Sequence, residues 1–267
     1  MGRQMGFFGD GHARRAAMLA CALAWFAWPA ELKAGTSERS RAPEAGSSTE
    51  PFGLPASPLF AGALREKWRA VERKLDDERV QMALCDGDRE RCASPAALRL
   101  LAIVDEARAR EGRARLGEIN RAINLAIRPM SDQAQYGQMD VWSPPLATFA
   151  HGAGDCEDYA IAKFFALHQA GVPPEDLRIV IVRDRMRGED HAVAAARLEG
   201  HWLTLDNRGM AMVEDGNATH YRPLFVIDQH GLMRYGDAPQ LADIPQRFGT
   251  EASLPNAAMQ PALSSTN

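Results

Sequence analysis

Residues 154–174 read GDCEDYAIAKFFALHQAGVPP, and they predict a helix that begins beside a cysteine, Cys156. Asp155 or Gly154 can cap the start of this helix, and Gly171 with the two prolines that follow ends it. Apolar side chains fall on several sides of the helix, so we expect it at the centre of the hydrophobic core.

Strand patterns follow this helix and bring two polar residues together. We expect strands at 177–182, 191–198 and 202–206, with a fourth near 224–228. Glu199-Gly200 is a candidate two-residue turn between the second strand and the third. In that register His191 and Asp206 are diagonal neighbours on one face of the sheet, within about 5–8 Å. A loop that is longer or shorter by one residue would put them on opposite faces.

Helical patterns fill most of the chain before residue 130. The first helix is expected at 59–84, with apolar residues near helical spacing at Leu64, Trp68, Val71, Leu75 and Val80. A second, opened by the cap and proline of Ser94-Pro95, extends to about residue 110, and a third covers about 114 to 127. Residues 131–154 have the composition of a loop. Helices followed by antiparallel strands predict the α+β class, with a helical N-terminal lobe packed on the sheet.

The two ends of the chain have the composition of an export signal and of flexible segments. Residues 1–34 are typical of a cleaved signal peptide, because Arg14-Arg15 precedes an apolar run that is too short to span a bilayer comfortably. An uncleaved signal anchor, or a lipoprotein attached through Cys21, is the alternative. Residues 35–58 predict a flexible linker and residues 250–267 a disordered tail, which leaves one domain at 59–249.

Net charge gives no reason to expect a nucleic-acid partner. The chain of 267 residues has a formal charge of −4, and its first 34 residues carry four basic and two acidic side chains. Cleavage would therefore leave a charge of about −6, the opposite of a basic binding surface.

Cysteine counting leaves one thiol over. Cleavage of the signal would discard Cys21 and leave Cys85, Cys92 and Cys156. Cys85 and Cys92 bracket a short polar loop that could close as a disulfide in an oxidising compartment, so Cys156 would be the unpaired thiol. A zinc site is the competing interpretation, although the chain has no CxxC pair.

Cys156, His191 and Asp206 have the chemistry of a nucleophile, a base and an orienting acid. A thiol in the first turn of a helix is expected to have a lowered pKa, because the unpaired N–H groups and the helix dipole favour the thiolate. The same N–H groups can bind the oxyanion that forms when a carbonyl is attacked. A buried, inert cysteine is the alternative, and the set of three favours acyl transfer.

Three carboxylates surround the thiol: Asp155, Glu157 and Asp158. They can act as caps that interact favourably with the helix N-terminus. Negative charge beside a thiol also opposes its ionisation. A divalent cation would relieve that conflict, and oxygen ligands in a loop before a helix suit Ca²⁺.

The run from Gly154 to Lys163, followed by His191-Ala192-Val193 and Leu205-Asp206-Asn207, resembles the bacterial transglutaminase-like cysteine proteinases. Within that family the resemblance is to the LapG-type periplasmic adhesin-processing proteases, and it covers roughly residues 120–235. It implies a papain-like, transglutaminase-type core with the catalytic Cys156 at the start of a central helix, His191 as the base and Asp206 as its orienting acid. It also implies a Ca²⁺ site on Asp155 and Glu157, with Asp158 beside it as a further candidate ligand.

The resemblance further implies a biological setting. The protein would be a calcium-dependent periplasmic cysteine endopeptidase that cleaves the N-terminal region of a large repetitive surface adhesin and so releases cells from a biofilm. Its partner would be an inner-membrane receptor that binds cyclic di-GMP and sequesters the protease. Two alternatives stay open: a transglutaminase that uses the same three residues, and a non-catalytic binding module with the same fold.

Overall fold

The structure is a computed structural model and describes residues 50–236. The expected signal peptide, most of the expected linker and the expected tail lie outside the described residues. The elements, in chain order, are η1 (Pro51–Gly53), β1 (Ala56–Pro58), α1 (Ala63–Gly87), α2 (Pro95–Arg108), α3 (Gly112–Ala126), β2 (Arg128–Pro129), α4 (Asp132–Tyr136), α5 (Pro145–His151), β3 (Ala153–Gly154), α6 (Cys156–Gln169), η2 (Pro174–Asp176), β4 (Leu177–Asp184), β5 (Glu189–Leu198), β6 (His201–Leu205), β7 (Val213–Glu214), η3 (Asp215–Asn217), β8 (Tyr221–Asp228) and β9 (Gly231–Tyr235).

The large sheet is antiparallel and has seven strands in the order β1-β9-β8-β4-β5-β6-β7. The hairpin of β5 and β6 has the predicted register, with Leu198 opposite His201 and Ala194 opposite Leu205. Glu199 and Gly200 form its turn with φ angles of 52° and 85°, the left-handed backbone that a tight two-residue turn requires. The predicted α+β arrangement of helices and antiparallel strands is confirmed.

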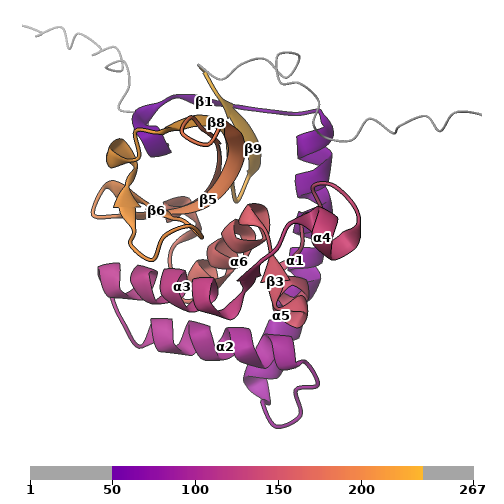
Figure 1. Cartoon of the computed structure of the whole chain (residues 1–267). Helices are drawn as coiled ribbons and strands as arrows, with labels where there is room; N and C mark the ends of the chain where they lie inside the picture. The colour runs from indigo at the N-terminus through magenta and orange to yellow at the C-terminus, as the bar shows by residue number, and fades with distance from the viewer. Residues whose placement is uncertain (1–49, 237–267) are drawn as a thin grey trace, which may run out of the picture. The chain divides into compact units, whose positions relative to one another are not determined.

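Helix α6 lies between the sheet and the other helices (Figure 1), where it packs on β4 and β5 from one side and on α2, α3 and α5 from the other. Every residue from Asp158 to Leu167 is buried, as the apolar pattern predicted. The helix ends where Gly171 takes a φ of 88°, and the Val172 N–H donates to the Leu167 carbonyl at 3.0 Å. Cys156 and Glu157, which precede the buried run, are only half-buried, so the start of α6 lies at the edge of the core.

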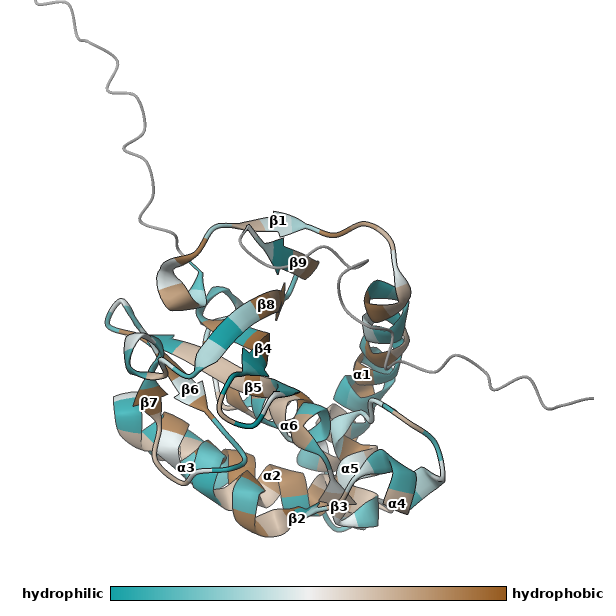
Figure 2. Ribbon diagram, turned by 45° about the horizontal axis from the view of Figure 1, so that its top comes forward, coloured by the Kyte–Doolittle hydropathy of each residue, from teal (hydrophilic) through white to brown (hydrophobic). Residues whose placement is uncertain are grey.

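Helix α1 differs in one respect from the pattern expected for it. Trp68, Val71 and Leu75 are buried as predicted, but Val80 is 62% exposed, and Glu78 takes the next inward position. Figure 2 shows apolar and polar residues mixed along the helices, which is the colouring expected of helices that cover one side of a core. The Glu78 carboxylate accepts hydrogen bonds from the Leu146 and Ala147 N–H groups and so caps α5.

A disulfide between Cys85 of α1 and Cys92 closes the loop that leads to α2, and it is the pair that cysteine counting suggested. Ser94 caps α2 as predicted, because its hydroxyl accepts a hydrogen bond from the Ala97 N–H at 3.2 Å. These contacts fix the loop that joins the two helices.

Two expected boundaries were wrong. Residues 50–58, assigned to the linker, belong to the fold, because β1 pairs with β9 and Glu50 forms an ion pair with the nearly buried Arg178. The segment 131–154, expected to be a loop, contains α4, α5 and the short strand β3. Both errors have one cause, since short elements that are held by distant partners leave little periodicity in the sequence.

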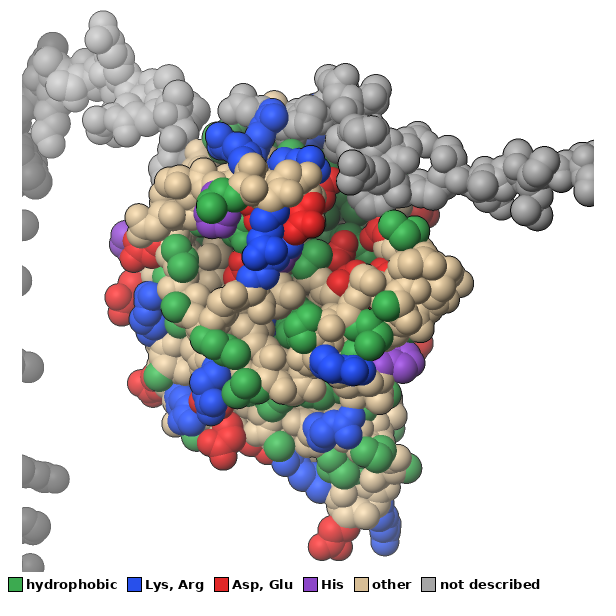
Figure 3. All heavy atoms as spheres, viewed as in Figure 1, with side chains coloured by type: hydrophobic (Ala, Val, Ile, Leu, Met, Phe, Trp, Pro, Cys, Tyr) green, Lys and Arg blue, Asp and Glu red, His purple; other side chains and the backbone are tan. Residues whose placement is uncertain are grey.

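The described surface is mixed in charge on the face drawn in Figure 3, where basic side chains lie among acidic ones. Within residues 50–236, no helix has the length and apolar character needed to cross a membrane.

Candidate active site

Cys156 is the first residue of α6 and is half-buried. It is the only cysteine of the described residues that is not in a disulfide. Asp155 stands at the N-cap position with extended backbone, and its carbonyl accepts the Tyr159 N–H at 3.1 Å. The Asp155 side chain makes no capping hydrogen bond. The N–H groups of the first helical turn are therefore not satisfied by this side chain.

His191 and Asp206 meet as the strand register predicted. The imidazole Nε2 lies 2.9 Å from Asp206 Oδ1, and the His191 side chain has no exposed surface. Because an ionised carboxylate can only accept, Nε2 carries the proton and Nδ1 is left as the acceptor. No described residue gives Nδ1 a hydrogen-bond partner.

Asp206 is held by several donors. Its Oδ1 accepts a second hydrogen bond from the Arg208 N–H at 3.0 Å, and its Oδ2 accepts one from the Tyr221 hydroxyl at 2.5 Å. Burial opposes the ionisation of Asp206, but the contacts with His191, Tyr221 and Arg208 outweigh it and hold the pKa of this carboxyl well below its usual range. Asp206 therefore stays charged and can stabilise an imidazolium.

The thiol lies beside the strand that carries His191. The Ala192 N–H on β5 is within hydrogen-bonding reach of the Cys156 thiol and favours its ionised form. Ala192 is the next residue after His191, and α6 packs directly on β5. The structure thus brings Cys156, His191 and Asp206 to one end of the sheet.

The expected lowering of the thiol pKa does not occur in this structure. Burial raises the pKa of Cys156 well above its usual range, and Glu157 raises it further, because its carboxylate accepts a hydrogen bond from the thiol at 2.9 Å. The negative charge of Asp155 acts in the same direction. Burial and the neighbouring carboxylates together therefore outweigh the effect of the helix N-terminus on the pKa of Cys156.

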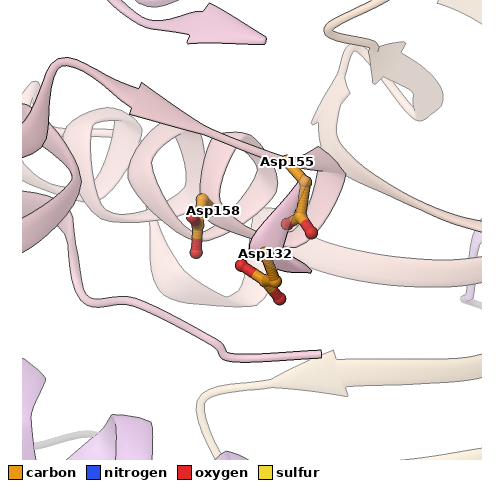
Figure 4. Close-up of side chains that lie close together, drawn as sticks. All are labelled: Asp132, Asp155 and Asp158. Carbon is orange, nitrogen blue, oxygen red and sulfur yellow. The ribbon is translucent and has the colours of Figure 1, made fainter. Parts of the chain in front are cut away.

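A cluster of three aspartates lies next to the thiol. Asp132 comes from α4, Asp155 from the turn before α6 and Asp158 from the first turn of α6, and one carboxylate oxygen of each lies within 4.8 Å of the others (Figure 4). Sequence reasoning named Asp155 and weighed Asp158, but it missed Asp132. Glu157, which it placed in the metal site, is not in this cluster and contacts the thiol instead.

Each aspartate of the cluster has one buried oxygen that no hydrogen-bond donor of the described residues reaches: Asp132 Oδ1, Asp155 Oδ1 and Asp158 Oδ2. The other Asp158 oxygen accepts from the Ser143 N–H at 2.8 Å, and the Val141 N–H holds the other oxygen of Asp132. Three neighbouring carboxylates that each have one buried oxygen without a donor are a donor set that fits a hard divalent cation.

Burial is the first cause of the raised pKa values in the cluster, and the charges of neighbouring carboxylates add to it. The pKa of Asp155 rises to about 10 and that of Asp158 to about 7, and the pKa of Asp132 is also raised. Gly154 leaves room for this crowding, because a Cβ there would lie 2.6 Å from Asp158 Oδ2. The glycine of the quoted sequence run is thus required by close approach.

A buried lysine, Lys163, lies two turns along α6 from the thiol and was quoted in the sequence run without a role. It has no exposed surface, and its Nζ donates to the Leu205 carbonyl at 3.2 Å. Burial lowers its pKa to about 7, while the charge of Asp206 acts in the opposite direction. The lysine therefore ties α6 to the residue before Asp206.

Comparisons with known proteins place these residues in a family. Residues 80–231, more than half of the chain, match the family model of the bacterial transglutaminase-like cysteine proteinases, BTLCP (peptidase family C93). No curated protein matches the chain.

Solved structures give similarities of limited extent. The structure of Legionella pneumophila LapG is 22% identical, with a TM-score of 0.49 over 58% of this chain and 86% of that one. A calcium-bound structure of Legionella pneumophila LapG is 24% identical, with a TM-score of 0.47 over 54% and 81%. The assignment therefore rests on the family model: this chain belongs to the family of bacterial transglutaminase-like cysteine proteinases.

Proposed function

We propose that this protein is a calcium-dependent periplasmic endopeptidase that cleaves the N-terminal region of a large repetitive surface adhesin. The observation that carries the catalytic part is the state of His191. Its Nε2 is bound to Asp206, whereas its buried Nδ1 has no partner among the described residues and Ala192, the next residue, reaches the Cys156 thiol. A base oriented in this way is what an attacking thiol requires.

In the proposed mechanism, His191 Nδ1 takes the proton of the Cys156 thiol as sulfur attacks the peptide carbonyl. The first-turn N–H groups of α6 stabilise the oxyanion. His191 then gives the proton to the leaving amine, and a thioester remains on Cys156. Water resolves the thioester, with His191 taking a proton from the water, and the free thiol returns. Asp206 keeps the imidazole in the tautomer that has Nδ1 free.

Asp132, Asp155 and Asp158 are the residues that would hold Ca²⁺. The support is the set of three buried carboxylate oxygens without donors, one from each residue, within 4.8 Å of one another. A bound cation would supply positive charge beside the thiol and offset the carboxylates that now oppose its ionisation. The site expected from the sequence was Asp155 and Glu157. In the proposed site Glu157 is not a ligand, and Asp132 and Asp158 join Asp155.

The location and the partners are proposed from the sequence and the family resemblance. Residues 1–34 have the features of an export signal, and the Cys85–Cys92 disulfide is the kind of bond that persists in an oxidising compartment. The resemblance supplies the adhesin as the substrate and an inner-membrane cyclic di-GMP receptor as the regulator.

The test is cleavage of an N-terminal fragment of the large repetitive surface protein of the same organism. We expect wild-type protein to cleave it, a chelator to stop cleavage, and added Ca²⁺ to restore it. Cys156→Ala should be inactive, and it serves as the folded control because alanine is accommodated at a helix start. Cleavage in excess chelator would remove the calcium part. A product crosslinked or labelled by an added amine, without cleavage, would favour the transglutaminase alternative.

A further inference from the structure

The second oxygen of the Asp206 carboxylate has its own donor, from an element that the sequence did not connect with the site. Oδ1 faces His191 Nε2 and the Arg208 N–H, whereas Oδ2 accepts a hydrogen bond from the Tyr221 hydroxyl at 2.5 Å. An O–H donor at this distance from a carboxylate is a strong, charge-assisted hydrogen bond. The Tyr221 hydroxyl is thus the donor that holds the second oxygen of the Asp206 carboxylate.

Tyr221 is placed firmly by its own surroundings. It is the first residue of β8, pairs with Asp184 at the end of β4, and is 6% exposed. Its N–H donates to the Ala218 carbonyl at 2.9 Å. Its ring centre lies 5.7 Å from the ring centre of His191. The phenol therefore contacts both members of the pair, reaching them from a strand that neighbours neither β5 nor β6 in the sheet.

A carboxylate held through one oxygen can rotate about its Cβ–Cγ bond and lose alignment with the imidazole. Side chains that hold a catalytic group within a few tenths of an ångström matter because misplacement slows the reaction. A donor on Oδ2 opposes this rotation and keeps Oδ1 directed at Nε2. The same hydrogen bond spreads the negative charge of the acid, which keeps the proton on the imidazole and not on the carboxylate.

We propose that Tyr221 is a positioning residue of the protease, whose hydroxyl orients Asp206 and, through it, the imidazole of His191 toward the thiol. The proposal rests on the proposed function of Cys156, His191 and Asp206. In this proposal Tyr221 acts through Asp206, so we expect its effect on turnover and not on binding.

The test compares Tyr221→Phe with a matched control, Tyr235→Phe. Tyr235 is also a buried tyrosine in the sheet, but none of the described residues gives its hydroxyl a hydrogen-bond partner. Both changes remove one buried hydroxyl and keep the ring. We expect Tyr221→Phe to lower kcat about tenfold with KM unchanged, which is the loss of roughly one net hydrogen bond to a charged group. Tyr235→Phe should keep the wild-type kcat.

A second readout does not depend on turnover. In wild-type protein the Nε2 proton of His191 should give a low-field NMR resonance that exchanges slowly with water. In Tyr221→Phe it should move to higher field and exchange faster, while Tyr235→Phe leaves it unchanged. A wild-type kcat in Tyr221→Phe would overturn the proposal, and so would an unchanged resonance. Wild-type protein without peptidase activity would instead overturn the proposed function, and the resonance would still decide whether Tyr221 orients the pair.

Discussion

Replacing the buried Lys163 with methionine should make the protein more stable at neutral pH. Lys163 has no exposed surface, and burial lowers its pKa from 10.5 to about 7. One pKa unit is equivalent to ~1.4 kcal/mol, so holding this lysine in the fold costs ~4 kcal/mol at pH 7. Methionine has a similar length and no charge. It forfeits the hydrogen bond to the Leu205 carbonyl and the contact of Nζ with the Tyr159 ring, together worth ~2 kcal/mol.

The sign of the pH dependence follows from the two pKa values. Between pH 7 and 10.5 the unfolded chain holds the Lys163 proton and the folded chain does not, so the contribution of Lys163 to stability rises with pH in this window. We expect Lys163→Met to be ~1–3 kcal/mol more stable than wild type at pH 7. At pH 9 the cost of the lysine falls to ~2 kcal/mol, and the difference should be close to zero.

The assay is urea unfolding followed by tryptophan fluorescence at pH 7 and pH 9, with a fixed calcium concentration. Lys74→Met is the control, because Lys74 is an exposed lysine of α1. Its stability difference from wild type should be small at both pH values. A Lys163→Met protein that is less stable than wild type at pH 7, or a difference independent of pH, would refute the reasoning.

Three further predictions concern stability. Calcium at 100 times its dissociation constant should raise the free energy of unfolding by ~2.7 kcal/mol, which is roughly 5–10 °C in Tm by calorimetry. Asp132→Asn should abolish this gain at the same calcium concentration. An equal gain in the variant would show that Asp132 is not a ligand. Replacing both Cys85 and Cys92 with serine should cost ~2 kcal/mol in urea unfolding, and a reductant should cost wild type the same amount but leave the variant unchanged. Burial raises the pKa of Glu78 to about 7, so wild-type stability should fall by ~2–3 kcal/mol more than that of Glu78→Gln as pH rises from 4.5 to 7.5. Parallel stability curves of the two proteins would contradict this prediction.

The parts of the site that sequence reasoning found are those set by local rules. The two-residue turn at Glu199-Gly200 fixes the register of β5 and β6, and the register alone decides that His191 and Asp206 share a face. The apolar pattern of α6 likewise placed Cys156 at the start of a central helix. The resemblance to the transglutaminase-like cysteine proteinases, and the fold that it implies, are confirmed by the family match.

The parts that sequence reasoning missed depend on contacts between distant segments. Asp132 lies in a segment that looked like a loop, and nothing local indicates that α4 folds against the start of α6. Tyr221 reaches Asp206 from β8, which is separated from β6 by two other strands. The expected pKa of Cys156 was wrong for a related reason: the helix N-terminus was visible in the sequence, but the burial of the thiol and the position of the Glu157 carboxylate were not.

The central claim is that Cys156 forms an acyl-enzyme that water resolves. The direct measurement is mass spectrometry of a fragment of the proposed adhesin substrate after incubation with the enzyme in ¹⁸O-labelled water, with acid-quenched enzyme mapped in parallel. The account predicts one ¹⁸O atom in the new C-terminal carboxylate, a thioester of the substrate on Cys156, and neither product with Cys156→Ala. Cleavage that persists in Cys156→Ala, or a thioester on another residue, would contradict it.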